Sequence, residues 1–130
     1  MNGRVLVRTP EQAERLSISW RQLDTESEIL LTGPLGTSIA RISGQQGEFV
    51  LERPNAEPLI AASLDELVNA AIGIELPVSA AIPVLSGERQ SLRYLDWRLN
   101  VVEFDQQGRP AVVNIVNGTN VIRLQVQSWR

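Results

Sequence analysis

The chain contains neither cysteine nor histidine among its 130 residues. Without cysteine it has no disulfide framework, no thiolate nucleophile and no cysteine-based metal site. Without histidine it lacks the commonest general base and metal ligand, which excludes Ser-His-Asp and Cys-His mechanisms. The carboxylates form no convincing catalytic pair, since Asp65 and Glu66 begin a predicted helix while Glu26 and Glu28 lie beside a turn. We therefore expect no catalytic residue, no metal and no cofactor.

Long hydrophobic runs are also missing, because no segment reaches the ~18 apolar residues that a membrane-spanning helix needs. The net charge of −3 gives no reason to expect nucleic acid as a partner. The same charge argues against a polybasic attraction to anionic lipid headgroups, so that any membrane contact should be mainly hydrophobic. The length fits one domain over residues 1–130, and no signal peptide is expected before Gly3.

Alternation of apolar and polar residues with period two predicts a β-rich chain. In the first half it predicts strands, each paired with the one before, over residues 4–8, 15–23, 28–32, 37–43, 48–53 and 58–61. In the last third, the alternation of Leu95, Trp97, Leu99 and Val101 changes phase at Val102, which indicates a bulge or a strand buried on both sides. A final hairpin is predicted over residues 111–116 and 121–129, around the Asn117-Gly118 turn signal.

The middle of the chain changes to a helical period. Ser63 and Glu66 have the spacing of a capping box, apolar residues recur at helical spacing as far as Ile72, and Gly73 is a typical C-terminal stop. A second short helix is predicted over residues 79–85, with Pro83 tolerated only near its first turn.

The turn between residues 30 and 36 carries an unusual leucine. Gly33, Pro34 and Gly36 are turn residues, yet Leu35 stands at the tip, where polar side chains are the rule. An exposed leucine forgoes about 1.5–3 kcal/mol of burial free energy. Leu35 therefore either folds back onto a neighbouring strand or points toward a membrane or lipid.

Several segments, in order along the chain, resemble the LolB family of outer-membrane lipoprotein receptors. They are Trp20-Arg21-Gln22, Leu30 to Gly36, Ser63 to Leu67 followed by Gly73 to Val78, and Ile122 to Trp129. The resemblance implies a mainly β (α+β) fold, in which a strongly curved antiparallel sheet forms an incomplete β-barrel lidded by one or two central helices. One departure is Val84, which stands where the family usually has a tryptophan shortly before a glycine.

The resemblance further implies a hydrophobic cavity that holds the acyl chains of lipoproteins. The candidate lining residues are the large apolar side chains expected on one face of the sheet and on the helices: Trp20, Leu30, Leu67, Ile72, Leu76, Leu85, Trp97, Leu99, Ile122, Leu124 and Val126. From the pattern alone these residues are more often an ordinary packed core. The resemblance to LolB favours a cavity over a packed core. It also implies that the loop Gly33, Pro34, Leu35 and Gly36 inserts into the membrane.

A LolB-like protein would be a monomer and a receptor, not an enzyme. It would accept acylated lipoproteins from a periplasmic carrier of the LolA type and deliver them to the inner leaflet of the outer membrane. It would be exported, and the sequence leaves open whether it is lipid-anchored, since the family's acylated cysteine is absent. Two alternatives stay open: an unanchored LolA-like carrier, and a structural or interaction module of the same fold with a filled core.

Overall fold

The computed structural model describes residues 1–33, 36–73 and 75–129, and within them the protein is mainly β, as predicted. The strands are β1 (Asn2–Arg8), β2 (Ala13–Leu23), β3 (Glu26–Thr32), β4 (Ser38–Gln45), β5 (Glu48–Glu52), β6 (Leu59–Ala61), β7 (Ser91–Tyr94), β8 (Trp97–Phe104), β9 (Pro110–Asn117) and β10 (Asn120–Ser128). The helices α1 (Leu64–Ile72) and α2 (Val78–Leu85) lie between β6 and β7 in the chain. All the strands belong to one antiparallel sheet.

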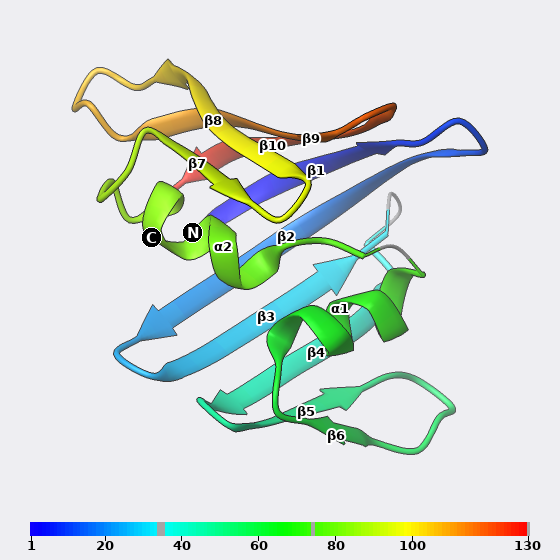
Figure 1. The fold of residues 1–130 in the computed structure, drawn as a ribbon. Coiled ribbons are helices and arrows are strands. Elements are labelled where there is room, and N and C mark those ends of the chain that lie inside the picture. Colours follow the sequence, from blue (N-terminus) through cyan, green and yellow to red (C-terminus); the bar gives the residue numbers. More distant parts are fainter. Residues whose placement is uncertain (34–35, 74, 130) are drawn as a thin grey trace.

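The sheet is two meanders joined at their first and last strands. Its order is β6-β5-β4-β3-β2-β1-β10-β9-β8-β7, so the two ends of the chain pair at its centre (Figure 1). Gly3 permits this pairing, because a Cβ there would lie 2.5 Å from the carbonyl oxygen of Gln125. The sheet is open, with β6 and β7 as its edges.

The two faces of the sheet differ in polarity. Both helices lie over the same face, which we call the inner face (Figure 1). Paired residues such as Ile29 and Ile42, or Val5 and Leu16, face inward and are buried there. The residues between them, which include most of the arginines, point to the outer face and to solvent.

The signals predicted for the first helix are present in α1. Ser63 is the N-cap, and its Oγ accepts hydrogen bonds from the amides of Asp65 at 3.1 Å and Glu66 at 3.5 Å. Gly73 ends the helix with φ of 75°, and its amide donates to the carbonyl of Asn69 at 2.7 Å. In the part of the chain that the structure describes, no helix is long and apolar enough to cross a membrane.

The second helix departs from its prediction at Pro83. Helix α2 begins at Val78, one residue earlier than expected, and Pro83 lies in its last turn instead of near its first. Pro83 has no amide hydrogen to donate to the carbonyl of Ser79, and the helix ends two residues later, at Leu85. The N-cap residue of α2, Pro77, makes no side-chain capping hydrogen bond. Instead, the Asp65 carboxylate of α1 accepts a hydrogen bond from the Ser79 amide at 2.8 Å, which links the starts of the two helices.

The alternation predicted from Leu95 onward begins only at Trp97, the first residue of β8. Leu95 is in the turn between β7 and β8, with φ of 54° and 78% of its surface exposed. Sequence alternation missed this turn because Asp96 is its only conventional turn residue. The predicted change of phase is confirmed, since the β8–β9 register shifts between Val101 and Glu103 and again before Phe104.

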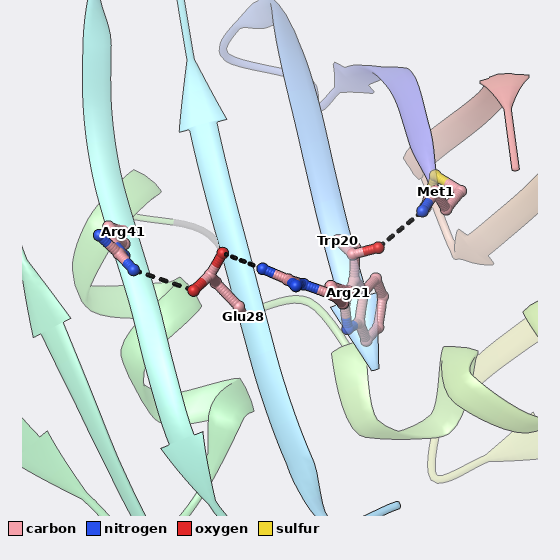
Figure 2. A network of polar contacts seen from close by, with 5 residues as sticks. All are labelled: Met1, Trp20, Arg21, Glu28 and Arg41. Atoms are coloured by element: carbon pink, nitrogen blue, oxygen red, sulfur yellow. Dashed lines mark hydrogen bonds and ion pairs between the residues drawn. The ribbon is translucent and has the colours of Figure 1, made fainter. Parts of the chain in front are cut away.

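On the outer face, Glu28 of β3 lies between two arginines from the neighbouring strands. Its carboxylate is 3.5 Å from Arg21 of β2 and 2.9 Å from Arg41 of β4 (Figure 2). The hydrogen bond and charge of Arg41, with a smaller contribution from Arg21, hold the pKa of Glu28 below its usual value. All three side chains are partly exposed, so these ion pairs contribute little stability individually.

Loss of the Asp65 carboxylate should uncouple the two helices. We expect Asp65→Ala to lower the free energy of unfolding by about 0.5–2 kcal/mol, the usual cost of losing a cap. Glu66→Ala is the matched control, because Glu66 is in the same first turn but makes no bond to α2. Denaturant unfolding of both variants measures the difference, and equal losses would show that Asp65 acts only on the dipole of α1.

The contribution of Glu28 to stability should depend on pH. Because its folded pKa is lowered, the contribution is complete above the ordinary value of 4.5 and is lost as the pH falls through the lowered value. We expect the difference in stability between the wild type and Glu28→Gln to be constant near neutral pH and to vanish in acid. Denaturant unfolding across this range tests it; a difference that persists in acid would contradict the assignment.

Candidate functional site

An apolar pocket lies between the helices and the inner face of the sheet, beneath the pairing of β1 with β10. Its floor comes from β1, β2, β3, β9 and β10, through Val5, Leu16, Ile18, Trp20, Ile29, Leu31, Ile115, Ile122 and Leu124. Its roof comes from α1, α2 and the segment between them, through Val68, Ile72, Leu76, Pro77, Val78 and Ala81. We call this the inner pocket.

A second hollow adjoins the inner pocket and shares Trp20 with it. Met1, Gln22, Ile82, Leu85, Ser86 and Trp129 complete its lining, and its volume is about 200 Å³. We call it the terminal pocket, because residues near both ends of the described chain line it.

A small polar network lies at the edge of the terminal pocket. The Trp20 indole Nε1–H donates to Oε1 of Gln22 at 3.3 Å, and the buried Ser27 hydroxyl donates to the same oxygen. The Met1 amino group donates to the Trp20 carbonyl at 2.7 Å (Figure 2), and burial lowers the pKa of that amino group. These bonds satisfy the polar atoms of Trp20 and fix its ring as a wall between the two pockets.

The lining of the inner pocket suits hydrocarbon but offers no groups for acid-base or nucleophilic chemistry, because every side chain in it is apolar. Across the described residues, no cluster of acidic side chains could hold a metal ion. The volume of the inner pocket is about 60 Å³, far below the roughly 300–1,000 Å³ of typical ligand sites. In this structure the helices therefore fill most of the space above the sheet.

The structure brings together about half of the cavity residues expected from the sequence. Trp20, Ile72, Leu76, Ile122 and Leu124 line the inner pocket, and Leu85 lines the terminal pocket. Leu67 and Leu99 are buried in the core outside both pockets, Trp97 borders a surface hollow beside Asp65 and Asn69, and Val126 is partly buried against the core.

Leu30 lies on the opposite face of the sheet from the one expected. It pairs with Ser19 and Arg41 on the outer face and is 38% exposed, whereas its neighbours Ile29 and Leu31 face the inner pocket. Because Ile29, Leu30 and Leu31 are all apolar, the sequence pattern of β3 does not show which of them face the inner side of the sheet. Sequence reasoning also missed Val5, Leu16, Ile18 and Ile115, which alternation could have found by following each strand's buried face.

The structure describes Gly33 and Gly36 of the loop expected to insert into membranes. The amide of Gly33 donates to the carbonyl of Thr37 at 2.8 Å, and the amide of Gly36 donates to the carbonyl of Gly33 at 3.0 Å. Gly36 has φ of 77°, a conformation that suits glycine. Pro34 and Leu35, which carry the hypothesis, lie outside the described residues.

A known protein family matches this chain over nearly its whole length. The family model described as "Outer membrane lipoprotein LolB" matches residues 1–129. The chain belongs to the LolB family.

Curated LolB proteins show moderate identity to the chain. It is 33% identical over 112 residues to the outer-membrane lipoprotein LolB of Pseudomonas putida strain W619, and 37% identical over 112 residues to that of Pseudomonas syringae pv. syringae strain B728a. Each alignment covers 83% of this chain and 55% of the relative. The LolB of Halorhodospira halophila is 28% identical over 147 residues, which cover 98% of this chain and 72% of that protein. The chain thus spans about half the length of the Pseudomonas relatives.

Enlarging the inner pocket should change what it binds. Ile29 and Ile42 pair directly and are both buried, but only Ile29 lines the pocket. We expect each Ile→Ala variant to lose about 2–5 kcal/mol of stability. Only Ile29→Ala should bind an apolar fluorescent probe more tightly, as measured by titration under conditions where both variants are folded. An equal change in both variants would place the binding site elsewhere.

Proposed function

We propose that residues 1–130 form a single lipoprotein-binding domain that acts as a receptor at the periplasmic face of the outer membrane. It accepts acylated lipoproteins from a LolA-like carrier and releases them into the inner leaflet, without covalent chemistry. The observation that carries the proposal is the wholly apolar inner pocket in a member of the LolB family. Burial is worth about 0.8 kcal/mol per CH₂, so an apolar lining is what an acyl carrier requires.

An incomplete barrel closed by a helical lid is the shape that best fits these contacts. Ten strands laid flat would separate the edge strands β6 and β7 by about 43 Å, at ~4.8 Å per strand. Helix α1 packs against β4, β5 and β6, α2 packs against β7 and β8, and the two helices touch each other. Two adjacent helices span only about 20–24 Å. A curved sheet, whose edges approach the helices from both sides, accounts for these contacts.

Cargo entry then requires the helices to move away from the sheet. The inner pocket of about 60 Å³ has no room for an acyl chain while Val68, Ile72 and Ala81 cover it. Few polar contacts hold the helices in place: Arg53 donates to the Ala70 carbonyl at 3.4 Å, and Asp65 joins α1 to α2. We propose that the acyl chain replaces the apolar side chains of the helices against the same floor.

The direct test is transfer of an acylated lipoprotein from a purified LolA-like carrier to this protein in solution. We expect the cargo to leave the carrier and co-elute with this chain, whereas the same lipoprotein without acyl chains should not. Cargo that stays on the carrier, together with no binding of apolar probes, would refute the proposal.

Delivery should depend on Leu35, which we propose as the membrane-inserting residue of the loop. Leu35→Glu should leave cargo acceptance unchanged but lower delivery to phospholipid vesicles about ten- to hundredfold, since burial of one leucine is worth about 1.5–3 kcal/mol. Thr37→Glu is the matched control, because it adds the same charge at an exposed position of the same loop. Delivery by Leu35→Glu at the wild-type rate would exclude the insertion hypothesis.

A further inference from the structure

Charges on the outer face of the sheet are separated into two areas that the net charge of −3 conceals. On the second half of β2 and on β3, β4 and β5 the outward residues include four glutamates and two arginines: Glu26, Glu28, Glu48, Glu52, Arg21 and Arg41. On β1, the first half of β2 and β7 to β10 they include six arginines and one glutamate: Arg4, Arg8, Arg15, Arg93, Arg98, Arg123 and Glu103.

A groove lies within the basic area. Leu6 of β1 pairs with Arg15 of β2 on one side and with Arg123 of β10 on the other. Two residue pairs further along, Arg8 faces Val121. Together with Val7, Ala13, Glu14 and Asn114, these residues line a groove of about 460 Å³. We call this the basic groove: three guanidinium groups set around the apolar side chains of Leu6 and Val121.

None of these arginines forms an ion pair with another described residue. Among the described residues, the ion pairs within 4.0 Å involve only Glu28 with Arg21 and Arg41, and Asp105 with Arg109. Arg123 donates from Nε to Asn114 Oδ1 at 3.3 Å, a neutral acceptor that orients the guanidinium without neutralising it. Glu14, the one carboxylate in the groove lining, makes no ion pair with any described arginine.

Elsewhere in the basic area, like charges even face each other. Arg93 of β7 and Arg98 of β8 are directly paired across the strands. Such a pair destabilises a sheet unless an anion lies nearby. The basic area thus carries an electrostatic cost in the free protein, which a negatively charged surface would remove.

The position of the groove indicates which surface that is. The β1–β2 hairpin and the β9–β10 turn, which border the groove, lie at the same end of the sheet as the end of β3 and the start of β4 (Figure 1). The segment that joins β3 to β4 is the membrane contact of the proposed function, on which this inference rests. We infer that the basic groove binds the phosphate headgroups of an anionic phospholipid bilayer and sets the orientation of the protein on it.

The chemistry of the groove suits a headgroup layer. All the basic residues of the chain are arginines, whose planar guanidinium groups can bind phosphate oxygens with two hydrogen bonds. Leu6 is half-buried and Val121 is 36% exposed, so the groove also offers apolar surface to the glycerol and upper acyl region. The net charge of −3 predicts no attraction of the whole chain to anionic headgroups. The basic groove would provide such an attraction locally.

Vesicle binding tests this inference. The wild type should partition more strongly onto vesicles of phosphatidylethanolamine with phosphatidylglycerol than onto phosphatidylethanolamine alone, and added salt should remove the difference. Each basic residue at an anionic surface raises partitioning about fivefold, so R15Q/R123Q should bind the anionic vesicles about 25-fold more weakly. R21Q/R41Q is the matched control, because it removes the same charge from arginines that pair with Glu28, and it should bind almost as the wild type does.

Three results would overturn the inference. They are equal partitioning of the wild type onto both vesicle types, equal losses in the two double variants, and a loss in R15Q/R123Q of cargo capture from the carrier instead of vesicle binding. The last result would make an acidic protein the occupant. Capture in solution also separates this inference from the proposed function, since a wild type that binds anionic vesicles but captures no cargo would refute only the latter.

Discussion

The pairing of β1 with β10 is the constraint on which the structure depends. It joins two meanders, one from each half of the chain, into a sheet with a single inner face. The inner pocket lies beneath this seam, since Val5 of β1 and Ile122 and Leu124 of β10 form part of its floor. On the other side, Leu6 and Arg123 of the same two strands line the basic groove. A single strand pair therefore positions both the apolar site and the charged one.

The helices and the cargo of the proposed function compete for the same apolar surface. In this structure α1 and α2 cover the floor of the inner pocket. Exchange of one apolar cover for another has a smaller cost than opening an empty cavity. In the described residues, the Arg53–Ala70 hydrogen bond joins α1 to the rest of the protein, whereas the Asp65–Ser79 bond joins the two helices to each other. This arrangement is consistent with a cover that can be displaced.

The sequence predicted local features well and pairings between distant segments poorly. Ser63, Gly73 and the Asn117-Gly118 turn act through neighbouring residues, and the structure has the helix ends and the hairpin that they indicate. The side of the sheet on which Leu30 lies could not be deduced, because three consecutive apolar residues carry no phase. The turn at Leu95 and the β1–β10 seam depend on tertiary contacts. The separation of charges on the outer face also could not be predicted without the strand register, because the net charge sums the residues of both faces.

The open edges of the sheet have a mechanical consequence. Strands β6 and β7 are three and four residues long and are not paired with each other. In a closed barrel, any widening must break hydrogen bonds between strands, because every strand has two neighbours. In an open sheet, small increments of twist at each strand pair would change the distance between β6 and β7 while every backbone ladder stays intact. Under the proposed function, such a change would let the sheet fit cargo of different bulk.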